Sequence, residues 1–396
     1  MSPHRVALVV QRYGVEVNGG AETLARRIAR LLSGDVEMTV LTTCSLDYRT
    51  WANHYAAGED EVEGVRVVRF PVTRERDPEA FDRLAPQAYA APEDLALGRR
   101  WMEAQGPDAP GLVAHLHERG HVYDAVAFVT YLYRTTADGI GPVHDRALLV
   151  PTLHDEPPAR LRIFDEVMAA PRMLIFSTEE ERELARIRFG VEDARARVAG
   201  WGLDPPPPTE PSRMAELGVK RPYALCVGRI DLSKGVGELV EHHARYRRAA
   251  PDGLDLVLVG GGEAPLPMQP WLHRLGFVEE PIKHDALAGA RVVVVPSPYE
   301  SLSLAQLEAW GHGRPTLVNA ASPVLEGQSR RSGGGLWYRD GDEYAAMIDL
   351  LARAAPLAGA IGRQGAGWVA ETCSWERVRA VWLEALAVAA SHGARR

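Results

Sequence analysis

The sequence predicts an α/β protein made of two similar halves, each a parallel β-sheet covered on both faces by helices. Short apolar runs alternate with helix-like segments along most of the chain, which is typical of such sheets. The length of 396 residues exceeds what one ordinary core accommodates. The run Pro205–Pro208 marks the clearest boundary, because consecutive prolines enter neither a sheet nor a helix interior.

The elements expected in the first half follow this alternation. Val6–Val10 is the first apolar strand, a helix runs from about Glu22 to Leu32, and Met38–Leu41 is the next strand. Residues 71–120 are rich in Pro, Ala and charge and break the rhythm, so we expect helices inserted there beside a cleft. The alternation resumes with strands expected at Ala125–Thr130, Leu148–Pro151 and Met173–Ser177.

The second half begins at about Tyr223 and repeats the pattern. The chain closes with an amphipathic helix from Trp375 to Ala389, which carries Val378, Trp382 and Leu386 at helical spacing. The apolar strands expected in this half are Ala224–Val227, Leu254–Val259 and Val292–Val295.

Composition narrows the class of protein. The hydrophobic content of 46% and charged content of 25% are typical of a soluble globular protein. A net charge of −8 argues against a broad surface for nucleic acid or anionic membranes. The first apolar run is too short for a secretory signal, and no segment has the length of a transmembrane helix. The three scattered cysteines indicate neither disulfides nor a zinc site, so we expect a cytoplasmic protein.

A glycine-framed loop, Gly228–Gly235, follows one of the expected strands and carries Arg229 and Lys234. Only three of the 45 basic residues are lysines. A lysine kept between a serine and a glycine in this background indicates a place for a point charge rather than for a planar guanidinium. The loop therefore suits an anion that approaches the backbone closely.

A second segment of interest follows the apolar run Val292–Val295. It contains two glutamates eight positions apart, Glu300 and Glu308. The pattern predicts a strand, a turn and then a helix, with Ser301 or Ser303 as the N-cap. The free amides and dipole of this helix start favour an anion. Two carboxylates beside an anion need hydroxyl partners of their own, such as those of a ribose and a sugar.

Together these stretches resemble the donor site of retaining, nucleotide-sugar-dependent glycosyltransferases, the type 4 family with the GT-B fold. The resemblance implies two Rossmann-like α/β/α domains that face each other across a cleft. Residues 1–203 would form the acceptor-side domain, with its helical insert at about 71–120. Residues 204–374 would bind the donor, and a C-terminal helix, 375–396, would return to the first domain.

The resemblance extends to three further segments. Asn18-Gly19-Gly20-Ala21-Glu22 is similar to the family's N-terminal glycine loop, and Gly260–Glu263 is similar to the glycine loop of its nucleotide domain. His154 stands where retaining members carry a histidine near the donor sugar. The implied catalytic residues are His154 and Glu300, and the implied donor-binding residues are Gly19, Gly20, Arg229, Lys234, Val278, Ser303, Leu304 and Glu308.

No metal site and no cofactor besides the nucleotide-sugar donor are expected. Asp340-Gly341-Asp342 resembles a metal-binding Asp-x-Asp of another glycosyltransferase fold, but its surroundings indicate a turn. Ser301 and Leu302 replace the glycine and aromatic residue that often follow the first glutamate in the family. The remaining histidines, among them His115, His117, His242 and His243, are expected to be solvated.

The function implied is transfer of a sugar, with retention, from a UDP- or GDP-sugar to a small-molecule or cell-surface glycan acceptor in a bacterium. The mechanism would be metal-independent departure and attack on the same face of the sugar. Two alternatives remain open. A nucleotide-sugar epimerase on the same fold would need further acid and base groups, and a non-catalytic nucleotide-sugar-binding module would have had no reason to keep all four charged residues.

Overall fold

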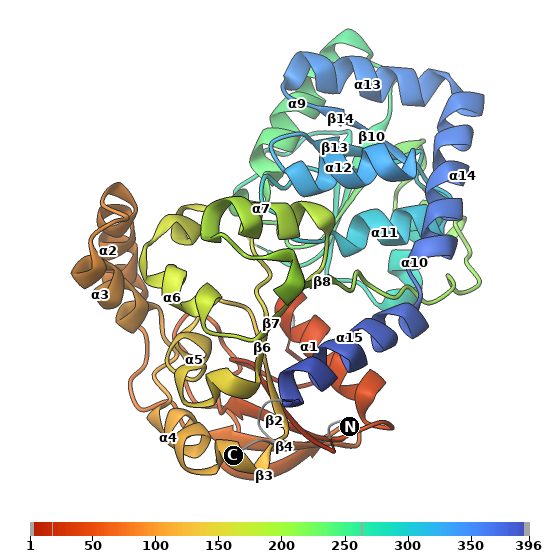
Figure 1. The fold of residues 1–396 in the computed structure, drawn as a ribbon. Helices are drawn as coiled ribbons and strands as arrows, with labels where there is room; N and C mark the ends of the chain where they lie inside the picture. Colours follow the sequence, from red (N-terminus) through yellow and green to blue (C-terminus); the bar gives the residue numbers. More distant parts are fainter. Residues whose placement is uncertain (1–3, 18, 263, 392–396) are drawn as a thin grey trace. The chain divides into compact units, whose positions relative to one another are not determined.

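The computed structural model describes residues 4–17, 19–262 and 264–391, and it divides into two compact units (Figure 1). Unit 1 consists of Met1–Gly200 together with Trp375–Arg396, and unit 2 consists of Trp201–Ser374. Each unit contains a single β-sheet flanked by helices. In the described part of the chain no single helix is long and apolar enough to cross a membrane, although α13 (Gly341–Arg353) and α14 (Ala355–Thr372) pass that test as a pair bent by 99°.

The sheet of unit 1 has the order β3-β4-β2-β1-β5-β6-β7-β8. All neighbouring strands are parallel except the first two, which form an antiparallel hairpin at the edge. The strands are β1 (Arg5–Val9), β2 (Glu37–Thr43), β3 (Gly58–Val62), β4 (Val65–Phe70), β5 (Ala125–Val129), β6 (Ala147–Val150), β7 (Met173–Phe176) and β8 (Ala196–Val198).

Helices flank this sheet, and three helices occupy the segment where an insert was expected. The insert helices are α2 (Pro78–Ala90), α3 (Leu95–Gln105) and α4 (Pro110–Arg119). The other helices and helical turns are α1 (Gly20–Leu32), η1 (Gly120–Val122), α5 (Arg134–Ala137), η2 (Gly141–Arg146), η3 (Pro157–Arg160), α6 (Ile163–Ala169), α7 (Glu179–Phe189), η4 (Asp193–Arg195) and α15 (Trp375–Ala390).

The last helix, α15, packs on the sheet of unit 1 although the whole of unit 2 separates it from the rest of that unit in sequence. Its buried face contains Val378, Trp382 and Leu386, as the helical spacing predicted. Arg379 forms an ion pair with Asp35 at its edge. The prediction that the chain returns to the first domain through its final helix is confirmed.

Unit 2 has a six-stranded, fully parallel sheet with the order β11-β10-β9-β12-β13-β14. Its strands are β9 (Tyr223–Val227), β10 (Asp255–Val259), β11 (Leu272–Gly276), β12 (Val292–Val295), β13 (Thr316–Asn319) and β14 (Gly335–Tyr338). Besides α13 and α14, its helices are α8 (Arg213–Glu216), η5 (Leu232–Lys234), α9 (Val236–Ala249), α10 (Glu280–Gly289), α11 (Leu304–Gly311) and α12 (Pro323–Ser332).

Successive residues of β9 enter opposite cores, which is why this strand is apolar throughout. Ala224 and Cys226 pack into one buried cluster, whereas Tyr223 and Leu225 pack into the other. Side chains alternate across a strand, so a sheet covered on both faces requires apolar residues at every position. The doubly covered sheet puts the loops at its carboxyl edge within reach of a ligand.

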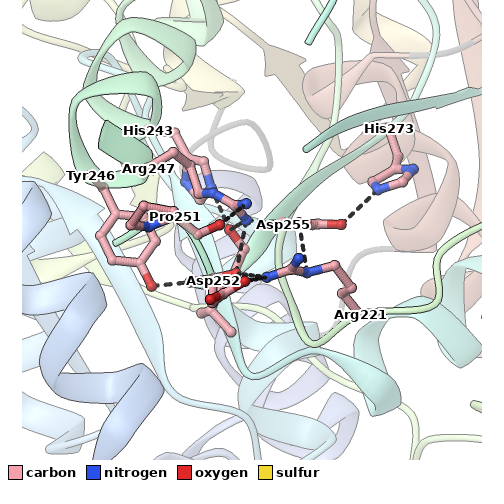
Figure 2. Close-up of polar contacts among 10 residues, drawn as sticks. Arg221, His243, Tyr246, Arg247, Pro251, Asp252, Asp255 and His273 are labelled. Carbon is pink, nitrogen blue, oxygen red and sulfur yellow. Dashed lines mark hydrogen bonds and ion pairs between the residues drawn. The ribbon is translucent and has the colours of Figure 1, made fainter. Parts of the chain in front are cut away.

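A buried polar network closes the opposite, amino edge of this sheet (Figure 2). Asp255, the first residue of β10, accepts hydrogen bonds from Arg247 at 2.8 Å and from His273 at 3.0 Å, and Arg221 lies 3.5 Å away. His243 is fully buried, with Nε2 2.9 Å from the Leu254 carbonyl oxygen and Nδ1 2.8 Å from the Tyr344 hydroxyl. The expectation that His243 is solvated was therefore wrong.

The burial of His243 predicts a loss of stability in acid. Burial lowers the pKa of His243 from 6.5 to about 4. At a pH between these two pKa values, His243 binds a proton in the unfolded chain but not in the folded protein. The free energy of unfolding therefore falls as the pH drops below 6.5, the pKa in the unfolded chain. We expect the free energy of unfolding to fall by ~2 kcal/mol through this residue between about pH 7 and about pH 5.

Urea unfolding of wild type and His243→Gln at both pH values tests this expectation. Glutamine keeps hydrogen-bonding groups at the position but does not titrate. Exposed His117, with the same substitution, provides the control. An acid-induced loss as large in His243→Gln as in wild type would contradict the assignment.

Candidate functional site

The loop between β9 and α9 packs closely against the loop after β12, and a glycine makes this close approach possible. Gly235 has φ +74°, and a Cβ on it would lie 2.4 Å from the carbonyl oxygen of Pro296. An alanine would therefore be both strained and in collision with backbone. Asp231 shapes the same loop, since its carboxylate accepts a hydrogen bond from the Lys234 amide.

This packing places Lys234 beside Glu300. The Lys234 ammonium donates to Glu300 Oε1 at 2.9 Å, although 66 positions separate the two residues. Their side chains are 30% and 15% exposed. Arg229 is more exposed and lies 3.4 Å from Asp231. The carboxyl edge of unit 2 therefore carries two cations within one short loop and a carboxylate that one of them neutralises.

The glycine loop after β10 packs closely on the backbone of the loop after β9. A Cβ on Gly260 would lie 1.8 Å from the Gly228 carbonyl oxygen, and one on Gly262 would lie 2.2 Å from that of Ile230. The Ile230 amide donates to the Gly261 carbonyl at 2.8 Å. Glu263, also part of the predicted motif, lies outside the described residues. Side chains larger than hydrogen would push these loops apart.

Helix α11 begins where the sequence indicated. Ser303 is its N-cap and accepts a hydrogen bond from the Gln306 amide, and Leu304 is its first residue. Glu300 precedes the helix, and Glu308 lies in its second turn. The backbone amides at this start have no intrahelical acceptors and carry the positive end of the helix dipole, which suits an anion.

The segment after β11 presents an exposed aromatic ring. Phe277 is 78% exposed, whereas its neighbour Val278 is partly buried against the apolar cluster that contains Leu225. Gly276 has φ +70° and turns the chain at this point. An exposed ring beside a backbone turn provides a flat surface on which a nucleobase can stack.

In unit 1, the helix α1 begins directly after Gly19, and Gly20 is its first residue. Glu22, in the first turn, is buried and accepts hydrogen bonds from Arg12 and Gln11. This network fixes the helix start to the end of β1. Asn18, the first residue of the predicted loop, lies outside the described residues.

His154 lies on the loop after β6, close to the carboxylate of Glu156. Its Nδ1 is 3.3 Å from Glu156 Oε1, which also accepts a hydrogen bond from the Tyr131 hydroxyl at 3.0 Å. Asp155, adjacent in sequence, pairs instead with Arg160. The His154 side chain is 26% exposed, so part of the imidazole is accessible.

A buried carboxylate that sequence analysis missed anchors this loop. Glu181 Oε1 accepts from the Leu153 amide at 2.7 Å and Oε2 from the Ser177 amide at 2.6 Å. Burial raises the pKa of Glu181 to about 7. The sequence pattern Thr178-x-x-Glu181 is that of a capping box, and Glu181 could have been recognised from it. Glu181 joins the loop of His154 to the start of α7.

Tyr133, on the loop after β5, connects the two predicted segments of unit 1. Burial raises its pKa, as does the charge of Glu22, and Glu156 acts in the same direction while Arg12 opposes it. The start of α1 and the loop of His154 therefore both lie within electrostatic range of one side chain. They share the carboxyl edge of the unit 1 sheet, where ligands of α/β proteins bind.

The Asp340-Gly341-Asp342 segment is a helix start. Asp340 is the N-cap of α13, and its carboxylate accepts from the amides of Asp342 and Glu343. Within residues 4–17, 19–262 and 264–391, no three His, Cys, Asp or Glu side chains are grouped as metal ligands are. The Asp340 carboxylate is engaged in capping.

Comparisons with known proteins identify similar sequences and the fold. Residues 221–354 match the family model described as "Glycosyl transferases group 1". A D-inositol 3-phosphate glycosyltransferase of Geodermatophilus obscurus is 32% identical over 269 residues, which cover 61% of this chain and 58% of that protein. The chain thus spans less than two thirds of this relative's length.

Solved structures match nearly the whole chain at low identity. Sucrose-phosphate synthase from Thermosynechococcus elongatus has a TM-score of 0.69 at 18% identity, with 95% of this chain and 96% of that chain covered. HepE of Anabaena, solved in complex with UDP and glucose, has a TM-score of 0.70 at 16% identity, with 97% and 100% covered. The chain therefore has the GT-B fold, and its residues 221–354 are similar to the glycosyl transferases group 1 family.

Proposed function

We propose that the protein is a retaining glycosyltransferase that moves a sugar from a UDP- or GDP-sugar to a small-molecule or cell-surface glycan acceptor. The observation that carries this proposal is the ion pair between Lys234 and Glu300 directly before the N-terminus of α11. At this sheet edge the cation and the helix start suit the phosphates of a sugar diphosphate. The carboxylate suits the hydroxyls of its sugar. HepE, one of the structural neighbours, was solved with UDP-glucose.

In the proposed reaction, negative charge grows on the β-phosphate as the glycosidic bond breaks. Arg229, Lys234 and the first amides of α11 stabilise this charge, which is the role of a preorganised electrostatic site. These groups take the place of a metal ion, so no cofactor besides the donor is needed. Glu300 and His154 hold the donor sugar, and the leaving phosphate accepts the proton of the attacking hydroxyl on the same face.

The donor alone separates this proposal from an epimerase. We propose incubating the protein with UDP-glucose and with GDP-linked sugars in the absence of acceptor. A transferase hydrolyses the donor slowly to a nucleoside diphosphate and the free sugar. Formation of a second nucleotide sugar would favour the epimerase instead, and no reaction with any donor or acceptor would favour a binding module.

Glu308→Ala should weaken nucleotide binding because the ribose hydroxyls lose their acceptor. We expect a dissociation constant higher by about 10- to 150-fold for UDP, as for a lost charge-assisted hydrogen bond. The loss should be much smaller for 2′,3′-dideoxy-UDP, which has no hydroxyl to donate. Calorimetry with both ligands measures the difference.

Glu241→Ala, which alters an exposed glutamate of α9, is the matched control for that experiment. It should leave both dissociation constants unchanged. Equal losses on both ligands in Glu308→Ala would assign Glu308 to the structure of α11 rather than to the ribose.

A further inference from the structure

Two of the three lysines of this chain form ion pairs with Glu300 and Glu308. Of the three lysines among 45 basic residues, Lys234 pairs with Glu300 and Lys283 pairs with Glu308, each at 2.9 Å. The third, Lys220, is exposed. We propose that Lys283 is a positioning residue that holds Glu308 in place to read the ribose diol of the donor. This inference rests on the function proposed above.

Lys283 reaches Glu308 from a neighbouring helix. It lies in the first turn of α10, and its ammonium donates to Glu308 Oε1 on α11 and to Glu280 Oε2 at 2.8 Å on its own helix. The side chains of Lys283 and Glu308 are 16% and 20% exposed, whereas Glu280 is 73% exposed. Glu308 is therefore fixed on one side by a nearly buried cation and open on another.

The pairing leaves acceptor capacity for a ligand. In the part of the chain that the structure describes, the contact with Lys283 is to Oε1, and no hydrogen bond to Oε2 is present. A carboxylate has about four lone-pair directions on its two oxygens. A ribose offers two vicinal hydroxyl donors, and these remaining directions can accept both while Lys283 keeps the carboxylate from rotating.

The charge of Lys283 also favours a role beside Glu308. A carboxylate near a diphosphate is repelled unless a cation compensates it. Burial alone would lower the pKa of Lys283, but the carboxylates of Glu308 and Glu280 outweigh burial and raise it, so the ammonium stays charged at neutral pH. Lys283 thus compensates the charge of Glu308 beside an anionic ligand.

The choice of lysine in an arginine-rich chain fits this role. A guanidinium binds a carboxylate with two parallel hydrogen bonds and would occupy both oxygens of Glu308. An ammonium is a point charge that occupies one oxygen. The packing of α10 on α11 has a separate contact, His284 Nδ1 to His312 Nε2 at 2.8 Å, so the helices do not depend on Lys283 alone.

The test uses Lys283→Met, Lys283→Arg and the control Lys220→Met, each titrated by calorimetry with UDP and with 2′,3′-dideoxy-UDP. The corresponding guanosine pair is titrated in the same way. Wild type and Lys220→Met should prefer the ribonucleotide by about tenfold or more, as for a charge-assisted contact. Both Lys283 variants should reduce this preference to about threefold or less. Lys283→Arg is decisive, because it preserves the ion pair.

Kinetics and a double-mutant cycle separate positioning from a merely structural effect. Lys283→Met should raise KM for the donor and leave kcat nearly unchanged, and its effect should not add to that of Glu308→Gln. Retention of the full ribose preference by either Lys283 variant, while Glu308→Ala loses it, would overturn this inference and leave the proposed function standing. A wild type that binds neither nucleotide, or that shows no ribose preference, would overturn both.

Discussion

His154→Ala should reduce sugar transfer by about 10²–10⁴-fold while nucleoside-diphosphate affinity stays close to that of wild type. The imidazole lies 3.3 Å from Glu156 and remains 26% exposed, so it is oriented and still accessible to a substrate. The groups proposed to bind the diphosphate and the ribose belong to unit 2, whereas His154 belongs to unit 1. Its removal should therefore affect the chemistry of the sugar rather than the affinity for the nucleotide.

Single-turnover transfer, measured beside nucleotide affinity by calorimetry, tests this expectation. His117→Ala is the control, because His117 is an exposed histidine of the same unit. The melting temperature of the His154 variant shows whether the loop after β6 keeps its structure. Transfer at nearly the wild-type rate would return His154 to a structural role.

Lys234→Ala should weaken nucleoside-diphosphate binding and turnover together, by ~1.5–3 kcal/mol, or about 10- to 150-fold. The substitution removes the charge-assisted contact that is proposed for Lys234 and the phosphates. It also leaves the Glu300 carboxylate without the ammonium that lies 2.9 Å from it, so a second negative charge would face the ligand uncompensated. Both effects act in the same direction.

Lys220→Ala is the matched control, since it removes an exposed lysine from the same unit. Affinity for UDP or GDP is measured by calorimetry, and turnover is measured at saturating donor. A Lys234 variant with the diphosphate affinity of wild type would show that the ammonium serves only the loop between β9 and α9.

Local patterns predicted three of the six strands of unit 2 and the start of α11. The apolar run Val292–Val295 is β12, and the serine at the start of the next helix, Ser303, is its N-cap. Both signals depend on residues close together in sequence: an apolar run between turn residues, and a side chain that caps a nearby amide. For the same reason Glu308 was placed correctly in the second turn of its helix.

The edge hairpin of unit 1 was not predicted, and its first strand shows why. β3 reads Gly-Glu-Asp-Glu-Val, and its first four residues are exposed, so it lacks an alternation of apolar and polar residues. The sequence of β4 is more typical of a strand, because Val65 and Val67 alternate with Arg66. A charged edge strand protects a sheet from pairing with other chains but lacks the pattern by which strands are recognised.

Long-range partners account for the other omissions. Lys283 meets Glu308 across 25 positions, and Glu181 meets Leu153 across 28, so only the folded chain brings each pair together. His243 is buried because the hydroxyl of Tyr344, 101 positions away, and a backbone carbonyl provide its hydrogen bonds. No local pattern distinguishes such a histidine from a solvated one.

The most direct test of the proposed function is thermal unfolding of the protein with UDP, GDP, dTDP and ADP in excess EDTA. A ligand that binds the native state raises the melting temperature. We expect at least one of these nucleotides to stabilise the wild type and Lys220→Ala, and to have little effect on Lys234→Ala and Glu308→Ala. The account would be contradicted if no nucleotide stabilised the wild type, or if stabilisation appeared only when magnesium or manganese replaced EDTA.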